Sequence, residues 1–304
     1  MLVTHGALQP VRSRCALTIG NFDGVHRGHR ALIERVVAKA RELELASCVL
    51  TFEPHPREYL SPAQAPARLT RLRDKLELLA ATGVQRVHVM SFDARLASLP
   101  AERFVEQALV GALGVRWLAI GRDFRFGARR GGDFALLAAL GRERGFSVEA
   151  MPDVLYDGER VSSSAVREAL ATGDFGRAER LLGHRYFISG RVAHGAKLGR
   201  GLGFPTANIV LRRAPPLSGI YVVEVEGYGP GVASVGRRPT VNPVAVPLLE
   251  VHLLERDEAL YGVRLRITFL KKLRDEAKFD GLAPLREAIA QDAREAREFF
   301  SKHG

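Results

Sequence analysis

The 304-residue sequence is poor in cysteine, in tryptophan and in long apolar runs, and each shortage excludes a class of protein. Its two cysteines, Cys15 and Cys48, do not stand at a metal-binding spacing, which argues against a disulfide framework and favours the cytoplasm. No stretch reaches the length of a membrane span, and no apolar run of a secretion signal follows the opening residues, so we expect no membrane partner. Internal repeats and low-complexity segments are absent as well.

The sequence also has fewer acidic than basic residues: 34 Asp and Glu against 45 Lys and Arg, which gives a net charge of +11. The positive excess predicts an anionic partner, either a nucleotide or a nucleic acid. Since the chain has one tryptophan and no basic run with interleaved aromatic residues, nucleic acid is the less favoured of the two. A content of 46% hydrophobic and 26% charged residues is typical of a folded globular chain, here with room for two domains.

Strands and helices alternate through the first half of the sequence. Apolar runs such as SCVLTF, VQRVHVMSF and VRWLAIG are separated by segments with helical spacing of apolar residues. This order predicts a parallel sheet covered by helices, a Rossmann-like fold whose ligands bind beyond the C-terminal strand ends. After Gly183 the pattern changes to short strands with Gly and Pro between them, which predicts an antiparallel β-barrel followed by a terminal helix. The fold class is therefore α/β plus β, with domains of residues 1–183 and 184–304.

The most informative stretch is IGNFDGVHRGHRALI, residues 19–33, in which a strand end, a Gly-rich turn and a helix start follow one another. Backbone N–H groups of such a turn, with the positive end of the helix dipole, favour a polyphosphate. His26 and His29 can point the same way and donate hydrogen bonds to a phosphate whose charge grows during displacement. The alternative of a tight turn with two surface histidines loses weight because the whole run stands between a strand and a helix.

The run GNFDGVHRGH resembles the signature of nucleotidylyltransferases, and in particular of their FAD synthetase branch. The resemblance implies adenylyl transfer from ATP, with His26 and His29 stabilising the transferring phosphoryl group. The other turn residues implied to bind ATP are Gly20, Phe22, Asp23 and Gly28. The segments TFEPHP and DFRFG are similar to the flavin side of that site, although a Pro-bounded connection and a solvated Arg-rich loop are the simpler alternatives. The residues implied to face the flavin are His55, Asp123, Phe124 and Phe126.

A hydroxyl-rich helix start follows in RVSSSAVREAL, residues 160–170. Its serines can cap a helix, which alone would explain them, and can also present donors to phosphate beside two arginines. The run resembles the second ATP signature of FAD synthetases, with Ser164 in place of a Thr and Ala165 where an Arg is common. The residues implied to contact the triphosphate are Arg160, Ser163, Ser164 and Arg167.

Between the first two strands of the expected barrel lies VAHGAKLGRGLGFPTANI, residues 192–209. A Gly-rich basic loop of this kind can wrap phosphates, and Thr206 and Asn208 offer hard oxygen ligands suited to Mg²⁺. The run closely resembles the riboflavin kinase signature. The residues implied to contact ATP and its phosphates are Gly195, Lys197, Gly199, Gly203, Thr206 and Asn208, of which Thr206 and Asn208 also hold the metal.

Glu250 lies in PLLEVHLLE, where it points to the face opposite a row of leucines. By itself it would more simply be a glutamate in solvent. Its place after the PTAN segment matches the glutamate that riboflavin kinases use as general base toward the flavin ribityl hydroxyl. We expect His252 to be structural.

From about Leu17 to the terminal helix, the motifs stand in the order found in bifunctional prokaryotic riboflavin kinase/FAD synthetases. The resemblance implies that the barrel phosphorylates riboflavin with MgATP to FMN, and that the first domain adenylylates FMN to FAD with release of pyrophosphate. The expected partners are riboflavin, FMN, FAD and ATP, the expected cofactor is Mg²⁺, and assembly as a homo-oligomer is left open. The segment SVGRRPT resembles a GxRPT loop of riboflavin kinases, with Arg237 where a small residue is usual. Two alternatives remain: an enzyme with one working half, suggested by Ala165 and Arg237, and a nucleic-acid-binding module on an adenylyltransferase fold.

Overall fold

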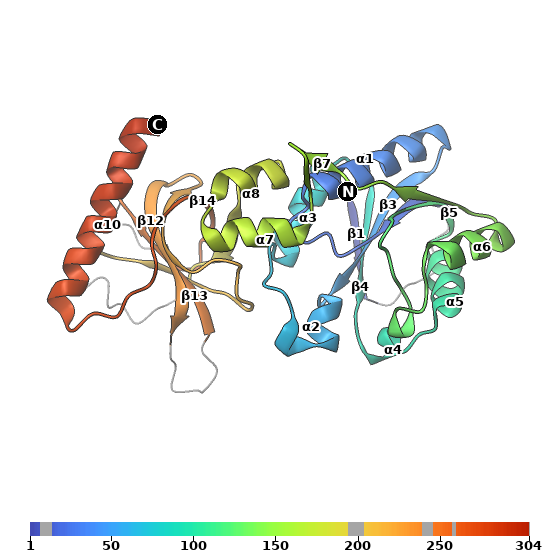
Figure 1. Ribbon diagram of the computed structural model, residues 1–304, viewed down its shortest axis with the longest axis horizontal. Helices are drawn as coiled ribbons and strands as arrows, with labels where there is room; N and C mark the ends of the chain where they lie inside the picture. Colours follow the sequence, from blue (N-terminus) through green and yellow to red (C-terminus); the bar gives the residue numbers. More distant parts are fainter. Residues whose placement is uncertain (7–13, 194–203, 239–245, 257–259, 304) are drawn as a thin grey trace. The chain divides into compact units, whose positions relative to one another are not determined.

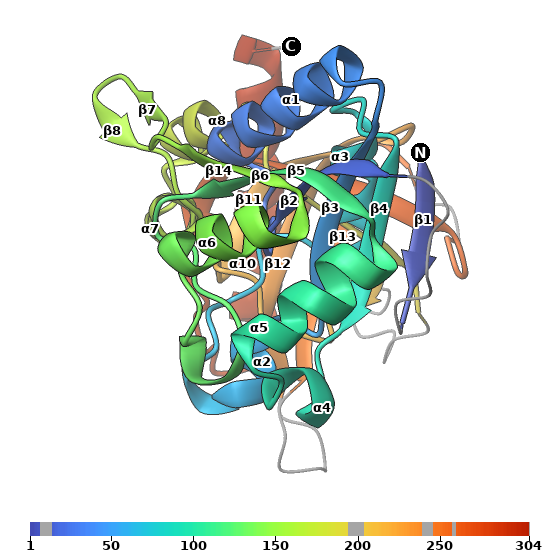
Figure 2. The same cartoon turned by 90° about the vertical axis from the view of Figure 1, so that its right-hand side faces the viewer.

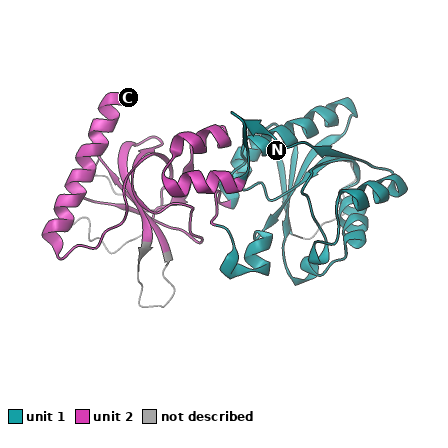
Figure 3. Ribbon diagram, viewed as in Figure 1, with its two compact units in different colours: residues 1–66, 72–162 teal, residues 67–71, 163–304 magenta. Residues whose placement is uncertain are grey.

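The computed structural model describes residues 1–6, 14–193, 204–238, 246–256 and 260–303. The chain forms two compact units (Figure 3), one of Met1–Pro66 and Leu72–Ser162 and the other of Ala67–Arg71 and Ser163–Gly304. Contacts thus group residues 163–183 with the second unit, whereas the sequence motifs predict a domain boundary at Gly183. That boundary concerns the two activities and stays a prediction.

The first unit is built around a parallel sheet of six strands in the order β1-β4-β3-β2-β5-β6. Its strands are β1 (Leu2–His5), β2 (Cys15–Ile19), β3 (Ala46–Glu53), β4 (Arg86–Ser91), β5 (Val115–Gly121) and β6 (Ser147–Met151). The central strand β2 is buried along its whole length, as expected for a strand covered on both faces. The Rossmann-like fold predicted from the alternating pattern is confirmed.

Helices cover both faces of this sheet, with α1 on one face and α5 and α6 on the other (Figures 1 and 2). The helical segments of the unit are α1 (Arg27–Glu42), α2 (Pro56–Leu60), η1 (Pro62–Gln64), α3 (Leu72–Ala80), α4 (Ala94–Ala97), α5 (Ala101–Phe104), a π-helix η2 (Val105–Ala112), η3 (Ala128–Arg130) and α6 (Phe134–Arg144). A short hairpin of β7 (Leu155–Tyr156) and β8 (Glu159–Arg160) completes it.

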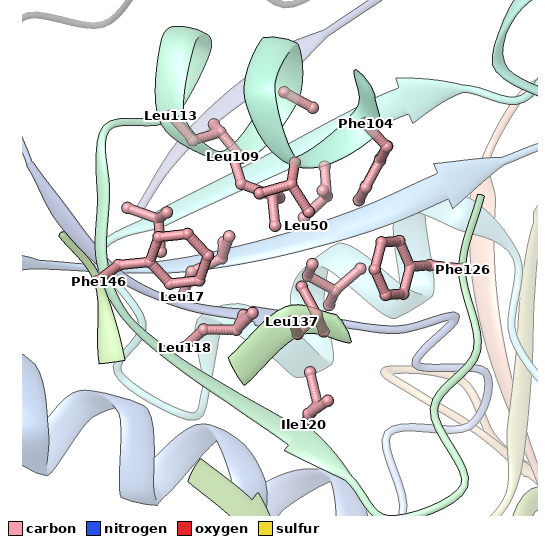
Figure 4. Packing of buried hydrophobic residues seen from close by; sticks show 14 of the residues in the cluster. Leu17, Leu50, Phe104, Leu109, Leu113, Leu118, Ile120, Phe126, Leu137 and Phe146 are labelled. Atoms are coloured by element: carbon pink, nitrogen blue, oxygen red, sulfur yellow. The ribbon is translucent and has the colours of Figure 1, made fainter. Parts of the chain in front are cut away.

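The main core of the first unit lies between the sheet and the α5–η2–α6 layer (Figure 4). Leu17, Leu50 and Leu118 from three neighbouring strands meet Leu109 and Leu137 from the helices, and all five are fully buried. The opposite face of the sheet packs Ala16, Trp117 and Ala119 against α1. Because both faces are packed, the C-terminal strand ends are where the unit can present polar groups to a ligand.

The second unit is built around an antiparallel sheet of six strands in the order β10-β13-β12-β11-β14-β9. Its strands are β9 (Phe187–Arg191), β10 (Ala207–Val210), β11 (Gly219–Val225), β12 (Gly229–Arg238), β13 (Val246–Leu253) and β14 (Arg264–Arg274). A bridge between Ala193 and Asn208 joins the two edges, so that the sheet is a nearly closed barrel, as predicted.

Among the described residues, the helices that accompany the barrel are α7 (Ser163–Thr172), α8 (Phe175–Leu182) and the terminal helix α10 (Leu282–His303). The last helix packs Ala296 against Ile220, Val222 and Val232 of the barrel wall, which confirms its predicted position. Throughout the described ranges, the helices are too short or too polar to cross a membrane.

Candidate active sites

The turn between β2 and α1 has an unusual backbone. Phe22 and Val25 have positive φ angles of 48° and 41°. A left-handed conformation costs a residue with a side chain about 1–3 kcal/mol, so it persists only where the surroundings hold it. Phe22 and Val25 are fully buried, and Asp23 between them is 3% exposed. The turn predicted from the glycines therefore owes its shape as much to buried side chains as to glycine.

His26 and His29 lie side by side where this turn enters α1. Their rings stack with centroids 3.6 Å apart, and His26 Nδ1 accepts a hydrogen bond of 3.3 Å from the backbone N–H of His29. In the neutral His26 ring the proton is therefore on Nε2. Both rings stand at the N-terminus of α1, where the helix dipole favours negative charge.

The glycines of the turn allow close approach of these rings. A Cβ atom at Gly28 would stand 3.3 Å from the His26 ring, and one at Gly20 would stand 3.1 Å from the Phe22 ring. Either contact is tight enough to displace the neighbouring ring. Sequence reasoning assigned Gly20 and Gly28 to ATP, and the structure adds that both positions also make room for side chains of the site.

The β7–β8 hairpin lies against the same helix start and carries Arg160. The guanidinium of Arg27, the first residue of α1, lies 4.5 Å from the centre of the Tyr156 ring. Arg160 contacts Asp123 at 2.6 Å and Asp153 at 3.0 Å, and the hydrogen bond that it donates to Asp123 raises the pKa of Arg160. The Arg160 and Asp123 side chains are 54% and 77% exposed, and such exposed pairs contribute little to stability. Arg160 can therefore exchange its carboxylate partners for a phosphate.

The residues expected on the flavin side lie at different depths. His55 caps α2 by accepting a hydrogen bond of 3.1 Å from the Arg57 backbone, and it is buried. Phe124 stacks on Phe126 with centroids 5.7 Å apart, but Phe126 belongs to the hydrophobic core, whereas Phe124 is half-buried. Of these two rings, Phe124 has the more surface to offer a planar ligand.

The predicted triphosphate residues of RVSSSAVREAL are divided by the structure. Arg160 belongs to the first unit, whereas Ser163, Ser164 and Arg167 lie on α7 in the second. α7 begins at Ser163, which confirms the predicted helix start. Arg167 donates a hydrogen bond of 2.7 Å from Nε to the carbonyl of Ala67. That these α7 residues meet the histidine pair stays a prediction.

The second unit contains a cavity of about 260 Å³ between the barrel and α10. Glu250 lines it together with Thr206, Ser234 and His252. Glu250 on β13 stands opposite Asn208 on β10 and opposite Ser234 on β12. The structure thus brings Glu250 together with Thr206 and Asn208, although Glu250 follows Asn208 by 42 residues in the sequence.

Asn208 has a buried side-chain oxygen that no donor satisfies in the described part of the chain. Its Nδ2 donates a hydrogen bond of 3.2 Å to the Thr206 carbonyl, while its Oδ1 is buried and has no hydrogen-bond partner among the described residues. A buried carbonyl oxygen without a donor is costly unless a ligand satisfies it. Mg²⁺ takes oxygen ligands and is often shared between few protein groups and substrate phosphates. No cluster of three His, Cys, Asp or Glu side chains in the described residues offers an alternative metal site.

Charged side chains close the other wall of this cavity. Arg274 pairs with Asp292 of α10 through bonds of 2.9 and 2.7 Å, and the Asp292 side chain is 6% exposed. Burial, and then the negative charge of Glu250, raise the pKa of Glu276. A Cβ atom at Gly236 would overlap the Glu276 carboxylate, so the Glu276 side chain would have to move if a larger residue stood there.

Sequence reasoning did not place His252 or Lys75 among the residues of these sites. His252 was expected to be structural, and its Nδ1 lies 3.0 Å from the Pro205 carbonyl, holding the segment that leads to Thr206. Lys75 on α3 was not singled out, although it is buried and donates to the turn before His26. Its only signal in the sequence is a lysine on a helix face of apolar residues. The predicted Gly195, Lys197, Gly199 and Gly203 lie outside the described residues.

Comparisons with known proteins match both halves of the chain. A family model for FAD synthetase matches residues 8–165, and one for riboflavin kinase matches residues 182–300. Bifunctional riboflavin kinase/FMN adenylyltransferase of Escherichia coli (strain K12) is 50% identical over 301 residues, which cover 97% of this chain and 96% of the relative. The protein of the same name from Pseudomonas fluorescens is 50% identical over 294 residues, with coverage of 95% and 94%.

A solved structure resembles the chain over its whole length. It is described as a macrolide-efflux protein from Streptococcus pneumoniae, with a TM-score of 0.81 and 27% sequence identity. The match covers 98% of this chain and 99% of the other. The likeness extends through both compact units.

Proposed function

The chain belongs to the family of bifunctional riboflavin kinases/FMN adenylyltransferases, and on this premise we propose which of its residues carry each reaction. The protein phosphorylates riboflavin with ATP to FMN and adenylylates FMN with ATP to FAD. Full-length identity of 50% to a bifunctional relative is the observation that carries this conclusion. The two reactions differ in which phosphorus atom of ATP is attacked.

We assign adenylyl transfer to the histidine pair on α1. An FMN phosphate oxygen attacks the α-phosphorus of ATP, and the bond to the pyrophosphate oxygen breaks. His26 and His29 donate hydrogen bonds to the α-phosphate oxygens, whose negative charge grows in the transition state. Support comes from their stacked rings at a helix N-terminus, where dipole and N–H groups favour an anion. The residues proposed to bind the remaining phosphates are Gly20, Phe22, Asp23, Gly28, Arg160, Ser163, Ser164 and Arg167.

The flavin of this reaction is proposed to lie against the segments that follow β3 and β5. Phe124 offers a half-buried ring, and Asp123 is exposed beside it. His55 holds the start of α2 at the end of β3. The four residues proposed on the flavin side remain His55, Asp123, Phe124 and Phe126, with Phe126 acting through the packing of Phe124.

We assign riboflavin phosphorylation to the barrel cavity. Glu250 takes the proton of the ribityl hydroxyl as that oxygen attacks the γ-phosphorus of ATP, and the β,γ-bridging bond breaks to release ADP. Asn208 Oδ1 and Thr206 are the proposed ligands of Mg²⁺, and the unpartnered oxygen of Asn208 supports this choice. When bound, Mg²⁺ neutralises charge on the ATP phosphates. The loop glycines 195, 199 and 203 and Lys197 are proposed to wrap these phosphates.

The setting of the enzyme is also a proposal. The described cysteines, Cys15 and Cys48, are both buried and free, which supports the cytoplasm. We propose that the adenylyltransferase domain spans residues 1–183 and the kinase domain residues 184–304, since the family models end at residue 165 and begin at residue 182. Nucleotides and flavins are its proposed partners, and nucleic acid is not.

Substitution in one site at a time tests these assignments. His29→Ala should lower FMN adenylylation by about 10²–10³-fold, because one preorganised donor to the developing charge is lost. The riboflavin kinase rate of the same preparation should stay within about twofold, since its groups lie in the barrel. A chromatographic time course with riboflavin, ATP and Mg²⁺ would show FMN accumulating without FAD.

The reciprocal variant is the control. Glu250→Gln keeps the shape of the side chain and removes the base, so riboflavin should persist while supplied FMN still becomes FAD. Loss of both activities in either variant would contradict two independent sites. Retention of FAD formation in His29→Ala would contradict the assignment of the histidine pair.

A further inference from the structure

Lys75 on α3 is a buried cation that neither assigned reaction uses. Its side chain is buried, with 2% of the residue surface exposed. Lysine is almost never fully buried unless its ammonium group is paired. Nζ donates hydrogen bonds to the Asn21 carbonyl at 3.1 Å and to Thr51 Oγ1 at 3.2 Å. The buried charge is therefore aimed at the backbone of the turn before the histidine pair.

The Asn21 carbonyl is held from two elements at once. Thr51 Oγ1 on β3 donates to it at 3.2 Å, in addition to the Lys75 ammonium from α3. Asn21 is followed by Phe22, whose φ of 48° is left-handed. A residue with a side chain keeps such a conformation only where its surroundings determine it. The two donors fix the peptide group that leads into this strained position.

Ring contacts connect Phe22 to the histidine pair. The Phe22 ring is fully buried and meets the His29 ring edge-on, with centroids 5.1 Å apart. His29 in turn stacks on His26 at 3.6 Å. Close-packed side chains pass on small displacements, and a shift of about 1 Å at reacting groups can cost about 10²-fold in rate.

We propose that Lys75 is a positioning residue of the adenylyltransferase, whose ammonium group anchors the Asn21 carbonyl so that His29 meets the α-phosphate of ATP. The inference rests on the proposed role of His29 in adenylyl transfer. Lys75 itself does not touch the reacting atoms in this proposal. Its contribution is to the rate of the chemical step, not to the affinity for ATP.

Lys75→Met tests the proposal, because methionine keeps an unbranched apolar stem without the ammonium group. The kcat of FMN adenylylation should fall about 10- to 100-fold, with the KM for ATP within about threefold. The riboflavin kinase rate should be unchanged. Arg73→Met is the matched control, since the Arg73 side chain lies on the same helix and is 68% exposed, and it should leave both rates unchanged. Unchanged adenylylation in Lys75→Met, or a rise in KM alone, would overturn the proposal.

A double-mutant cycle with His29→Asn separates positioning from general destabilisation. If Lys75 acts through His29, Lys75→Met should cost less than about threefold in the His29→Asn background. If the rate losses of the two single variants instead multiply in the double variant, the proposal is overturned. If His29→Asn alone leaves adenylylation unchanged, the assignment of His29 fails. An unchanged rate in Lys75→Met alone would refute only the role of Lys75, so the two failures are distinguishable.

A second variant covers the case in which Lys75→Met does not fold. Thr51→Val removes the other donor to the Asn21 carbonyl with little change of volume. It should lower adenylylation in the same direction, by about three- to tenfold, while the kinase rate and the melting temperature stay near those of the parent protein. Equal loss of both activities, or no loss in Thr51→Val, would reject the anchoring of Asn21.

Discussion

At the scale of single residues, two unusual features lie within the proposed sites: a buried oxygen without a donor and a residue with a left-handed backbone. Asn208 Oδ1 is buried without a donor in the described part of the chain, and Phe22 holds a left-handed φ of 48°. Both features are costly, and both lie beside residues to which we assign chemistry. Neither is visible in the sequence, where Asn208 and Phe22 are simply members of a motif.

Removing the unpartnered oxygen should affect the kinase alone. Asn208→Leu should lower riboflavin phosphorylation by about 10- to 100-fold, because a proposed Mg²⁺ ligand is lost. Asn208→Asp keeps an oxygen at this position and should retain more of the rate. Initial rates against MgCl₂ concentration would measure the effect, and FMN adenylylation serves as control. Equal rates for Asn208→Leu and the parent protein would exclude Asn208 as a ligand.

At the scale of elements, the hydrophobic pattern predicts the regular strands and helices. It does not predict the contacts between residues far apart in the sequence that hold these elements in place. The predicted alternation is confirmed, including the helix that begins after Pro100 and the terminal helix on the barrel. Edge strand β1 was not predicted from the opening residues, because its partner β4 lies some 80 residues further on. Lys75 and Asn21 are separated by 54 residues, and no local pattern reports such a contact.

The β1 edge carries a pH-dependent contact. His88 on β4 joins Thr4 Oγ1 at 2.7 Å through Nδ1 and the Gly6 carbonyl at 3.3 Å through Nε2, which suits a neutral ring with its proton on Nε2. Burial lowers the pKa of His88 below its usual 6.5. The unfolded chain therefore binds the proton more tightly, so the His88 contribution is complete above the unfolded pKa and is lost as the pH falls toward the folded pKa.

We expect the free energy of unfolding of the first unit to decrease as the pH is lowered from 7.5 to below 6.5, in part through His88. His88→Asn, which does not titrate, should show a flatter dependence over this window. Denaturant unfolding at several pH values would measure both. Identical slopes for the two proteins would show that another group governs the dependence.

At the scale of the whole molecule, contacts and motifs divide the chain differently. The motifs place the boundary at Gly183, whereas contacts attach α7 and α8 to the barrel. The reason is packing of Phe175 on α8, whose ring lies 5.8 Å from Tyr221 and 6.3 Å from Phe269. The sequence shows where long helices give way to short strands, which marks a change of architecture. It does not show on which unit α7 and α8, the two helices before that change, pack.

Two fragments distinguish these boundaries. Residues 163–304 should be more stable than residues 184–304, by about 1–3 kcal/mol, because the half-buried Phe175 ring makes two aromatic contacts worth about 0.5–1.5 kcal/mol each. Thermal unfolding with and without riboflavin would compare them, and Phe175→Ala in the longer fragment should bring its stability toward that of the shorter one. Equal stability would show that the helices contribute nothing to the barrel.

The size of the barrel cavity has a consequence for the timing of catalysis. A space of about 260 Å³ is smaller than the roughly 300–1,000 Å³ typical of pockets for drug-sized ligands. On the proposed assignment of riboflavin phosphorylation to this cavity, we expect a three-ring flavin with its ribityl chain to displace Leu285 and Ile289 of α10, which line it. Association that must wait for a wall to move is slower than free encounter. We therefore expect substitutions in the terminal helix to change the rate at which riboflavin binds.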